Sequence, residues 1–549
     1  MHYIAALDVG TTTVRCFVLN EKCEIRGSAV EAVELLNPKP GYFEIEPEGL
    51  WRKIVRVIKT AVQNAQILPS QISCLGISSQ RCTFLTWNHL TQEYFHNFIT
   101  WKDLRSDGLV DKWNNSLTLK TINSLAYALY LLTRSNRFLA GSVLKMMNGQ
   151  VTLRLLYEIQ NNLKLKEALK TKSARIELLD SWILYKLRSG NGENPNVEHI
   201  ADITSCTATG LFDPFLLDWS PMMKFVFGID TSLFSSQYTG LFSSLFIGDY
   251  LTINFQSSLL PKIVNNSYKH FGHINPVDFG PEWKNCQIPI TSSISDQAAA
   301  IFGSQCYSKG DVKITIGTGA FLDLITGNKC HASLKGMYPL VAWQFDETTF
   351  CVEGAAHDMG TVIAWGQNCG LFADPAETSS IAESITDTNG VYFVPAFSGL
   401  GAPINDHKAA SGFIGITPST TKAHLIRALL ESIVFRLVQL CKTAEEEETG
   451  QKLKILKVDG GVSRNNFVCQ FLADASGIHV ERARNPESSI LGATYAAGIN
   501  FGLWKTFNDI SKFRDIERVF EPNREKYHEI CKRMNIWLKA IERFGHWYC

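Results

Sequence analysis

The 549-residue sequence lacks features that would direct it to a membrane, to a polyanion or to an oxidising compartment. No apolar run reaches the roughly 18 to 20 residues of a membrane span, and no basic and apolar leader is visible, so neither a span nor a secretory signal is expected. The 53 basic and 53 acidic residues cancel, which argues against a nucleic-acid partner. The 14 cysteines lack CxxC or Cys/His ligand spacing, so reduced core thiols are expected.

What the sequence does contain is enough apolar material for sizeable cores. Hydrophobic residues make up 45% and aromatic residues 11% of the chain. The length predicts about two to four domains. We therefore expect a globular, cytoplasmic protein, with the oligomeric state left open, a homo-oligomer included.

The first strongly patterned stretch is a predicted β-hairpin. Apolar runs at 5–7 and 14–19 flank a turn that contains Asp8, Gly10 and three threonines, Thr11 to Thr13. Glycine lets the backbone approach a ligand, threonine hydroxyls and amides can donate to an anion, and a carboxylate can meet a hydrated divalent cation. The pattern predicts a phosphate-binding hairpin, although a threonine-rich turn can equally be only a turn.

Two later stretches carry related glycine turns. Residues 311–325 form a second predicted hairpin around Gly317-Thr318-Gly319, and this quasi-repeat suggests two domains of common ancestry. Residues 455–466 run from a predicted strand through Gly460-Gly461 into a helix. A diglycine before a helix N-terminus is typical of a nucleotide site.

Polar residues also follow two predicted buried strands. The strand at 72–78 leads into Ser79-Gln80-Arg81, and the strand at 288–295 leads into a helix that begins at Asp296 or Gln297. Open α/β sheets bind ligands at such strand ends. A third cluster, which contains Trp101, follows a predicted strand end near residue 99.

The remaining stretches are assigned more coarsely. Pro47 opens a predicted helix with apolar residues at helical spacing. Residues 106–190 are predicted to be mainly helical, including helices over 109–113, 151–163 and 176–187. Asp202, Thr204 and Thr207 are placed in a polar loop. The hydroxyl-rich segment 235–258 is interpreted as a surface insertion, with a further strand pair as the alternative.

The three glycine turns, in this order, resemble those of the superfamily of sugar kinases, actin and Hsp70. Within it, the chain resembles the carbohydrate kinases of the FGGY type, and among them the glycerol kinases, along nearly its whole length. The matching stretches are residues 37–41, 76–81, 180–182, 295–297, 317–319, 353–355, 393–403, 458–461 and 491–493.

This resemblance implies a fold and an activity. The fold would be α/β, with two ribonuclease-H-like domains, residues 1–304 and 305–549, flanking an ATP cleft. The activity would be phosphorylation of glycerol by ATP to sn-glycerol 3-phosphate. Asp296 would be the base that takes the proton of the attacking hydroxyl, and Asp8 would hold Mg²⁺ through water.

The resemblance also implies the binding residues. Those expected at ATP are Thr11, Thr12, Thr13, Arg15, Thr318, Gly360, Gly461 and Asn465. Those expected at glycerol are Arg81, Trp101, Asp296, Gln297 and Phe321. Structural roles are the alternatives: Asp8 can cap a turn, and Asp296 and Asn465 can cap helices. Arg81 can form a surface ion pair, and the two aromatic residues can belong to the core.

Two positions depart from the family pattern in the acceptor pocket. Glycerol kinases have a glutamate directly after the Gln-Arg pair, where this chain has Cys82, and a pocket tyrosine falls at Met147. The phosphoryl-transfer residues are kept, whereas the acceptor pocket is altered. A kinase of another polyol or sugar, and a nucleotide-binding regulatory scaffold with weak catalysis, therefore stay open as alternatives.

Overall fold

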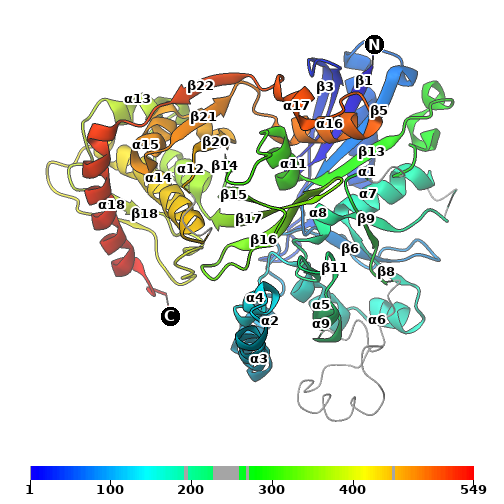
Figure 1. The fold of residues 1–549 in the computed structure, drawn as a ribbon, viewed down its shortest axis with the longest axis horizontal. Helices are drawn as coiled ribbons and strands as arrows, with labels where there is room; N and C mark the ends of the chain where they lie inside the picture. Colours follow the sequence, from blue (N-terminus) through cyan, green and yellow to red (C-terminus); the bar gives the residue numbers. More distant parts are fainter. Residues whose placement is uncertain are drawn as a thin grey trace. The chain divides into compact units, whose positions relative to one another are not determined.

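The computed structural model divides into two interleaved units, whose elements are labelled in Figure 1. It describes residues 2–190, 194, 196–226, 259–267, 271–447 and 452–548. Unit 1 comprises Met1–Gly303, Leu340–Thr349 and Ser489–Phe513, and unit 2 comprises Ser304–Pro339, Phe350–Ser488 and Arg514–Cys549. The division into domains 1–304 and 305–549 stays a prediction, and the predicted insertion 235–258 lies outside the described residues.

Unit 1 is built on a five-stranded sheet of order β13-β5-β1-β2-β3. Strands β1, β2 and β3 form an antiparallel meander, and β5 and β13 extend it in parallel to β1. The strands are β1 (Tyr3–Val9), β2 (Thr13–Asn20), β3 (Ile25–Ala32), β5 (Ile72–Ser79) and β13 (Ile290–Ser295). A smaller sheet of order β4-β7-β6-β8 accompanies it, with β4 (Glu44–Ile45), β6 (Phe84–Asn88), β7 (Phe98–Ile99) and β8 (Ala174–Leu178).

Unit 2 repeats this strand order. An antiparallel meander β14-β15-β17 is extended by β20 and β21, which run parallel to β14, and β22 closes the edge. The strands are β14 (Val312–Ile316), β15 (Ala320–Gly327), β17 (Thr348–Ala356), β20 (Ile455–Asp459), β21 (His479–Ala483) and β22 (Ile516–Phe520). Most of β16 (Tyr338–Gln344) belongs to the segment Leu340–Thr349 of unit 1. The shared order confirms the fold expected from the two similar hairpins.

Helix α1 (Pro47–Asn64) shows how local sequence sets one of the flanking helices. Proline occupies its first turn, and the Glu46 carboxylate accepts the Glu48 amide at 2.9 Å. Apolar residues at helical spacing, among them Leu50, Ile54 and Ile58, are buried. They pack with β1 and β5 in one hydrophobic cluster, so the predicted helix is confirmed.

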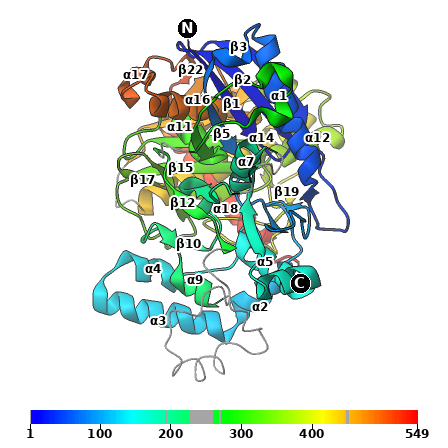
Figure 2. The same ribbon diagram turned by 90° about the vertical axis from the view of Figure 1, so that its right-hand side faces the viewer.

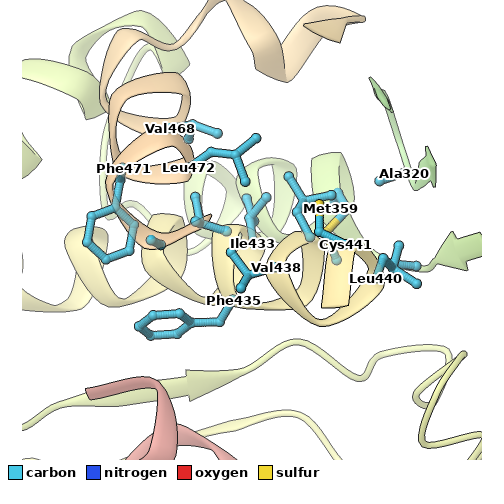
Figure 3. Close-up of a cluster of buried hydrophobic side chains, with 14 of the residues drawn as sticks. Ala320, Met359, Ile433, Phe435, Val438, Leu440, Cys441, Val468, Phe471 and Leu472 are labelled. Atoms are coloured by element: carbon cyan, nitrogen blue, oxygen red, sulfur yellow. The ribbon is translucent and has the colours of Figure 1, made fainter. Parts of the chain in front are cut away.

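The core of unit 2 forms around helix α14 (Lys422–Glu447) and helix α15 (Asn466–Ser476). Figure 3 shows Ile433 and Val438 of α14 close to Val468 and Leu472 of α15. Met359 of helix α12 (Met359–Asn368) lies beside Cys441 in the same cluster (Figure 3).

The mainly helical prediction for residues 106–190 holds with one correction. The structure has α2 (Asp107–Asn115), α3 (Leu117–Thr133), α4 (Asn136–Ser142), α5 (Val151–Asn161), α6 (Leu163–Lys170) and α7 (Leu179–Ser189). The predicted helix over 176–187 begins only at Leu179, because β8 pairs with β6 through Ile176 and Leu178. Burial alternates at the start of β8, as a strand requires.

Unit 1 also contains a helix from late in the chain. Helix α16 (Ser488–Phe501) contributes Ile490 and Ala493 to a cluster with Ala6 and Phe17 of the sheet. At Gly76 of β5, an added Cβ would lie 2.4 Å from the Ala493 carbonyl oxygen. Only a glycine therefore permits this helix-to-sheet approach.

Candidate active site

Three neighbouring strands of unit 1 end level with one another. Val9 of β1 pairs with Ser79 of β5, and Ser79 pairs with Ser295 of β13. All three strands run parallel, so the residues that follow them leave the same edge of the sheet. These are the residues that the sequence marked: the turn after Asp8, the Gln80-Arg81 pair and Asp296.

The Asp8 carboxylate is buried and fully engaged. Its Oδ1 accepts the Ser78 hydroxyl at 2.7 Å, and its Oδ2 accepts the Arg15 guanidinium and, at 3.2 Å, the Ser489 hydroxyl. The Asp8 side chain is 4% exposed, against 24% for Arg15. The sequence prediction placed Asp8 and Arg15 in one hairpin, and the structure adds Ser78 and Ser489 as its partners.

The groups around Asp8 determine how a metal ion could be held there. Within the part of the chain that the structure describes, no group of three or more His, Cys, Asp or Glu residues could hold one. A single carboxylate with both oxygens occupied does not make a protein cage. It does fit the usual situation of Mg²⁺, which keeps several waters and takes other ligands from substrate phosphates.

The threonine turn is linked to two other predicted site residues. The Thr11 hydroxyl donates to Gln80 Oε1 at 2.7 Å and accepts Trp101 Nε1 at 2.9 Å. The Gly10 amide donates to the Thr13 carbonyl at 2.9 Å, which closes the turn. The Thr12 side chain is exposed. The structure thus brings Trp101, predicted at the acceptor, into contact with Thr11, predicted at ATP.

Asp296 begins helix α11 (Asp296–Gly303) directly after β13. Its Oδ1 accepts the Gln297 amide at 2.7 Å and lies 4.0 Å from Arg81 Nε. The Asp296 side chain is 30% exposed and the Arg81 side chain 12%. A carboxylate held at a helix N-terminus, beside an arginine and still accessible, is placed to accept a proton from a bound alcohol.

A buried hydrogen-bond network holds the backbone just before Asp296. The Ser295 amide donates to the Thr204 hydroxyl at 2.7 Å, and this hydroxyl donates to Asp202 Oδ1. The other Asp202 oxygen accepts Asn266 Nδ2 at 2.5 Å, and the same Nδ2 donates to the Ser293 carbonyl at 3.0 Å. The network thus ties Asp202 to two carbonyl or amide groups of β13.

The prediction of a polar loop in this region was wrong. Asp202 and Thr204 were placed in a polar loop, but Asp202 ends β9 (Ile200–Asp202) and Thr204 lies in α8 (Ile203–Cys206), both buried. Burial raises the pKa of Asp202 well above its usual value. The neighbouring Asp180 accepts the Asp202 amide at 2.8 Å, and burial raises its pKa to about 7. The one Asp and three Thr at 202–209 were the available signal.

Cys82, which was predicted in the acceptor pocket, is buried. The Cys82 thiol donates to the Ala208 carbonyl at 3.1 Å, and its backbone φ is 60°. Arg154 donates to the Cys82 carbonyl at 2.8 Å, and burial lowers the pKa of Arg154 to about 10. Met147 begins the turn that leads to α5, where its carbonyl accepts the Gln150 amide at 3.2 Å.

In unit 2, the second glycine turn meets the start of helix α12. The Gly360 amide donates to the carbonyls of Gly317 and Thr318, each at 2.9 Å. A Cβ on Gly360 would lie 2.6 Å from the Gly317 oxygen, so glycine is required there. The Thr318 side chain is exposed at the tip of the turn. Phe321 is half-buried on β15, where it pairs with Thr315.

The diglycine turn has one open and one packed glycine. A Cβ on Gly460 would lie 2.6 Å from the Ile316 oxygen, whereas a Cβ on Gly461 would meet nothing within 4 Å. Space beside Gly461 is what a ligand at this turn needs. Asn465 caps α15 by accepting the Val468 amide at 3.1 Å, and its Nδ2 donates to Thr378 at 2.8 Å. Asn465 therefore has the capping role named as its alternative.

Comparison with known proteins identifies the family. Residues 3–241 match the N-terminal domain of the FGGY family of carbohydrate kinases, and residues 312–501 match its C-terminal domain. The chain is similar to "Glycerol kinase 5" of Bos taurus, with 40% identity over all of this chain and 96% of that relative. It is 31% identical to "Glycerol kinase" of Halothermothrix orenii, over 99% of each chain.

A solved structure shows the same architecture. The crystal structure of Plasmodium falciparum glycerol kinase with ADP matches with a TM-score of 0.83 and 27% identity, over 99% of this chain and 98% of that one. The fold is the two-domain, mixed α/β fold of sugar kinases. The chain belongs to the FGGY family of carbohydrate kinases, which confirms the resemblance inferred from its motifs.

None of the helices that the structure describes combines the length and the apolar character needed to cross a bilayer.

Proposed function

We propose that the chain transfers the γ-phosphoryl group of ATP to glycerol, giving sn-glycerol 3-phosphate and ADP. The observation that carries the proposal is the placement of Asp296, a partly exposed carboxylate that begins α11 beside Arg81. Membership of a carbohydrate kinase family, relatives named glycerol kinase and a structural neighbour solved with ADP support it.

In this proposal Asp296 accepts the proton of the glycerol hydroxyl as its oxygen attacks the γ-phosphorus. Arg81, Trp101 and Gln297 hold the other hydroxyls and cover the carbon face, and Phe321 is the aromatic residue proposed from unit 2. Phosphoryl transfer depends mainly on positioning and on neutralising charge. An acid–base contribution of about 10²- to 10⁴-fold is typical of a positioned base.

The phosphates of ATP are proposed to meet hydrogen-bond donors of the two glycine turns. In unit 1 these belong to Thr11 to Thr13 and Arg15, and in unit 2 to Thr318. Gly360, Gly461 and Asn465 are proposed to border the adenosine. Magnesium, held by the phosphates and by Asp8 through water, would supply the charge neutralisation that the reaction needs.

The test is phosphorylation of glycerol by the purified full-length protein with Mg·ATP. Asp296→Asn keeps the size of the side chain and removes its basicity, so we expect kcat to fall by about 10²- to 10⁴-fold. Glu525→Gln, an exposed acidic residue in the first turn of α18 (Arg524–Phe544), is the matched control and should keep full activity. Full activity of Asp296→Asn would show that another group is the base.

A second candidate, a kinase of another polyol or sugar, is favoured by Cys82. Its thiol is bound to the Ala208 carbonyl and offers no carboxylate to an acceptor hydroxyl. A screen of polyols and sugars, read as ADP release, separates the two. A much higher kcat/KM for another acceptor would replace glycerol, and nucleotide binding without turnover on any acceptor would favour a regulatory scaffold.

A further inference from the structure

Helix α3 exposes large apolar side chains along most of its length. Six of them are more than 40% exposed: Leu117, Leu125, Tyr127, Leu129, Leu131 and Leu132. Leu117 and Leu132, at opposite ends of the helix, are each 82% exposed, and Leu119 is its buried residue. Large apolar side chains exposed together on one helix are typical of an interaction site.

The helix lies at one end of unit 1. Figures 1 and 2 both show α3 and α4 side by side, away from the five-stranded sheet. The α4 side of α3 is packed closely, since a Cβ on Gly141 would lie 3.2 Å from the Ala126 Cβ. Asn123 of α3 also donates to the Leu144 carbonyl, which follows α4, at 3.2 Å. The apolar residues named above occupy the other side.

The chain segment that contains α3 carries charge of one sign. From residue 112 to residue 157 the sequence contains no Asp or Glu, although the whole chain is balanced. Arg154 is buried, and Arg137 pairs with Asp213 at 2.7 Å. The exposed basic residues of this stretch are Lys112, Lys120, Arg134 and Lys145. We call these four residues, with the six apolar ones, the α3 surface.

We propose that the α3 surface docks onto an anionic lipid membrane. Its leucines would enter the boundary between headgroups and acyl chains, while lysine and arginine stems reach the lipid phosphates. Tyr127 and Tyr130 lie 6.3 Å apart between ring centroids, and tyrosine is enriched at membrane–water interfaces. The 17-residue helix carries Lys120 in its first turn, so it would lie in the interface and not span the bilayer.

A second copy of the chain fits the α3 surface less well. At 100° per residue, the six apolar residues cover roughly 200° of the helix circumference, whereas a helix-to-helix seam is much narrower. Two such surfaces face to face would also bring like charges together, Lys120 and Arg134 among them. A fluid anionic surface accepts the wide apolar arc and complements the charge.

The experiment is co-sedimentation of the full-length protein with vesicles. One set is phosphatidylcholine alone, and the other contains roughly one-third phosphatidylserine. We expect binding to the anionic vesicles, weakened by salt, and a fall of about tenfold or more for Leu125→Ser/Leu132→Ser and for Lys120→Gln/Lys145→Gln. The control Leu90→Ser/Leu163→Ser changes two leucines that are 74% and 78% exposed outside α3 and should bind normally.

The outcomes divide cleanly. All substituted side chains are exposed, so unchanged thermal unfolding is expected and verifies that each variant folds. Absence of vesicle binding, or binding that the α3 variants leave unchanged, overturns the proposal. A dimer in solution that Leu125→Ser/Leu132→Ser abolishes, without vesicle binding, overturns it in favour of a second copy. The proposed kinase activity is measured separately and should not change in these variants.

Discussion

At the scale of the residue, Thr204 is the link between a buried carboxylate and the backbone before Asp296. A hydroxyl can accept and donate at once, and Thr204 does both, toward Ser295 and Asp202. An apolar side chain of the same shape would take this acceptor away from the Ser295 amide, whereas Asp202 Oδ1 would keep its bond from the Thr204 amide at 2.9 Å.

We therefore predict that Thr204→Val lowers the free energy of unfolding by about 1–3 kcal/mol. Because the Ser295 amide loses its acceptor, the start of α11 loosens, and the proposed phosphorylation should lose kcat while the KM for ATP stays unchanged. Thr204→Ser keeps the hydroxyl and should restore both. Chemical denaturation and steady-state kinetics measure the two effects.

The matched control is Thr209→Val in the same segment. The Thr209 hydroxyl donates to the Cys206 carbonyl at 2.7 Å and accepts the Leu211 amide at 3.1 Å, so it is equally buried and equally bonded. It has no bond to β13, and its loss should cost stability but not kcat. An equal loss of kcat in both variants would contradict a positioning role for Thr204.

The sequence could place residues whose neighbours are local. Asp8 and Arg15 could be placed in one hairpin, although their ion pair was not predicted, and Asp296 could be placed at a helix start because it follows a buried strand directly. The bond from Ser295 to Thr204 joins residues 91 positions apart, and no pattern in either stretch reports it. Asn465 shows the other limit, since capping and ligand binding need the same side chain at the same position.

At the scale of the element, the hairpins, α1 and α11 could be predicted from periodicity and turn residues. The level endings of β1, β5 and β13 could not, because register is set by pairing between distant strands. The error at Ile176 has the same origin. An apolar run of a few residues suits a strand or a helix, and pairing with β6 decides it.

The contact between the second glycine turn and α12 yields a prediction for two glycines. Gly360→Ala places a Cβ 2.6 Å from a backbone oxygen, so we expect a loss of about 1–3 kcal/mol in unfolding free energy. Gly461→Ala meets open space and should leave stability unchanged. If adenosine lies beside Gly461, as proposed, this second variant should weaken ADP binding. Thermal unfolding and calorimetric titration with ADP separate the effects.

The two glycine variants serve as controls for each other, because Gly360→Ala tests stability and Gly461→Ala tests ADP binding. Normal stability of Gly360→Ala would show that α12 can shift without cost. Normal ADP affinity of Gly461→Ala, with stability also unchanged, would remove Gly461 from the proposed adenosine site and leave the description of the turn intact.

At the scale of the whole molecule, the two units share a strand order but not a simple boundary. The similar hairpins predicted a duplicated fold, and the sheets confirm it. Residues 489–513 belong to unit 1 although they come late in the chain, and this could not be predicted. An apolar pattern with helical spacing indicates that a helix is buried, but it does not indicate which element the helix packs against. The small residues Gly492 and Ala493 of α16 are the one sign of this close packing in the sequence.

The last prediction follows from this return of the chain. A Cβ on Gly492 would lie 1.8 Å from the Ala299 oxygen of α11, the helix that begins at Asp296. Gly492→Ala should therefore lower stability by about 1–3 kcal/mol or more, and hydrogen exchange should rise in β1, β5 and α11, although the substitution lies late in the chain. Strands β14 and β20 of unit 2 should change less.

The control is Gly108→Ala, at a helical glycine whose added Cβ would have nothing within 4 Å. This variant should leave hydrogen exchange unchanged everywhere. Equal increases in both units would mean that they unfold together, and the separate stability of unit 1 would then have to be abandoned.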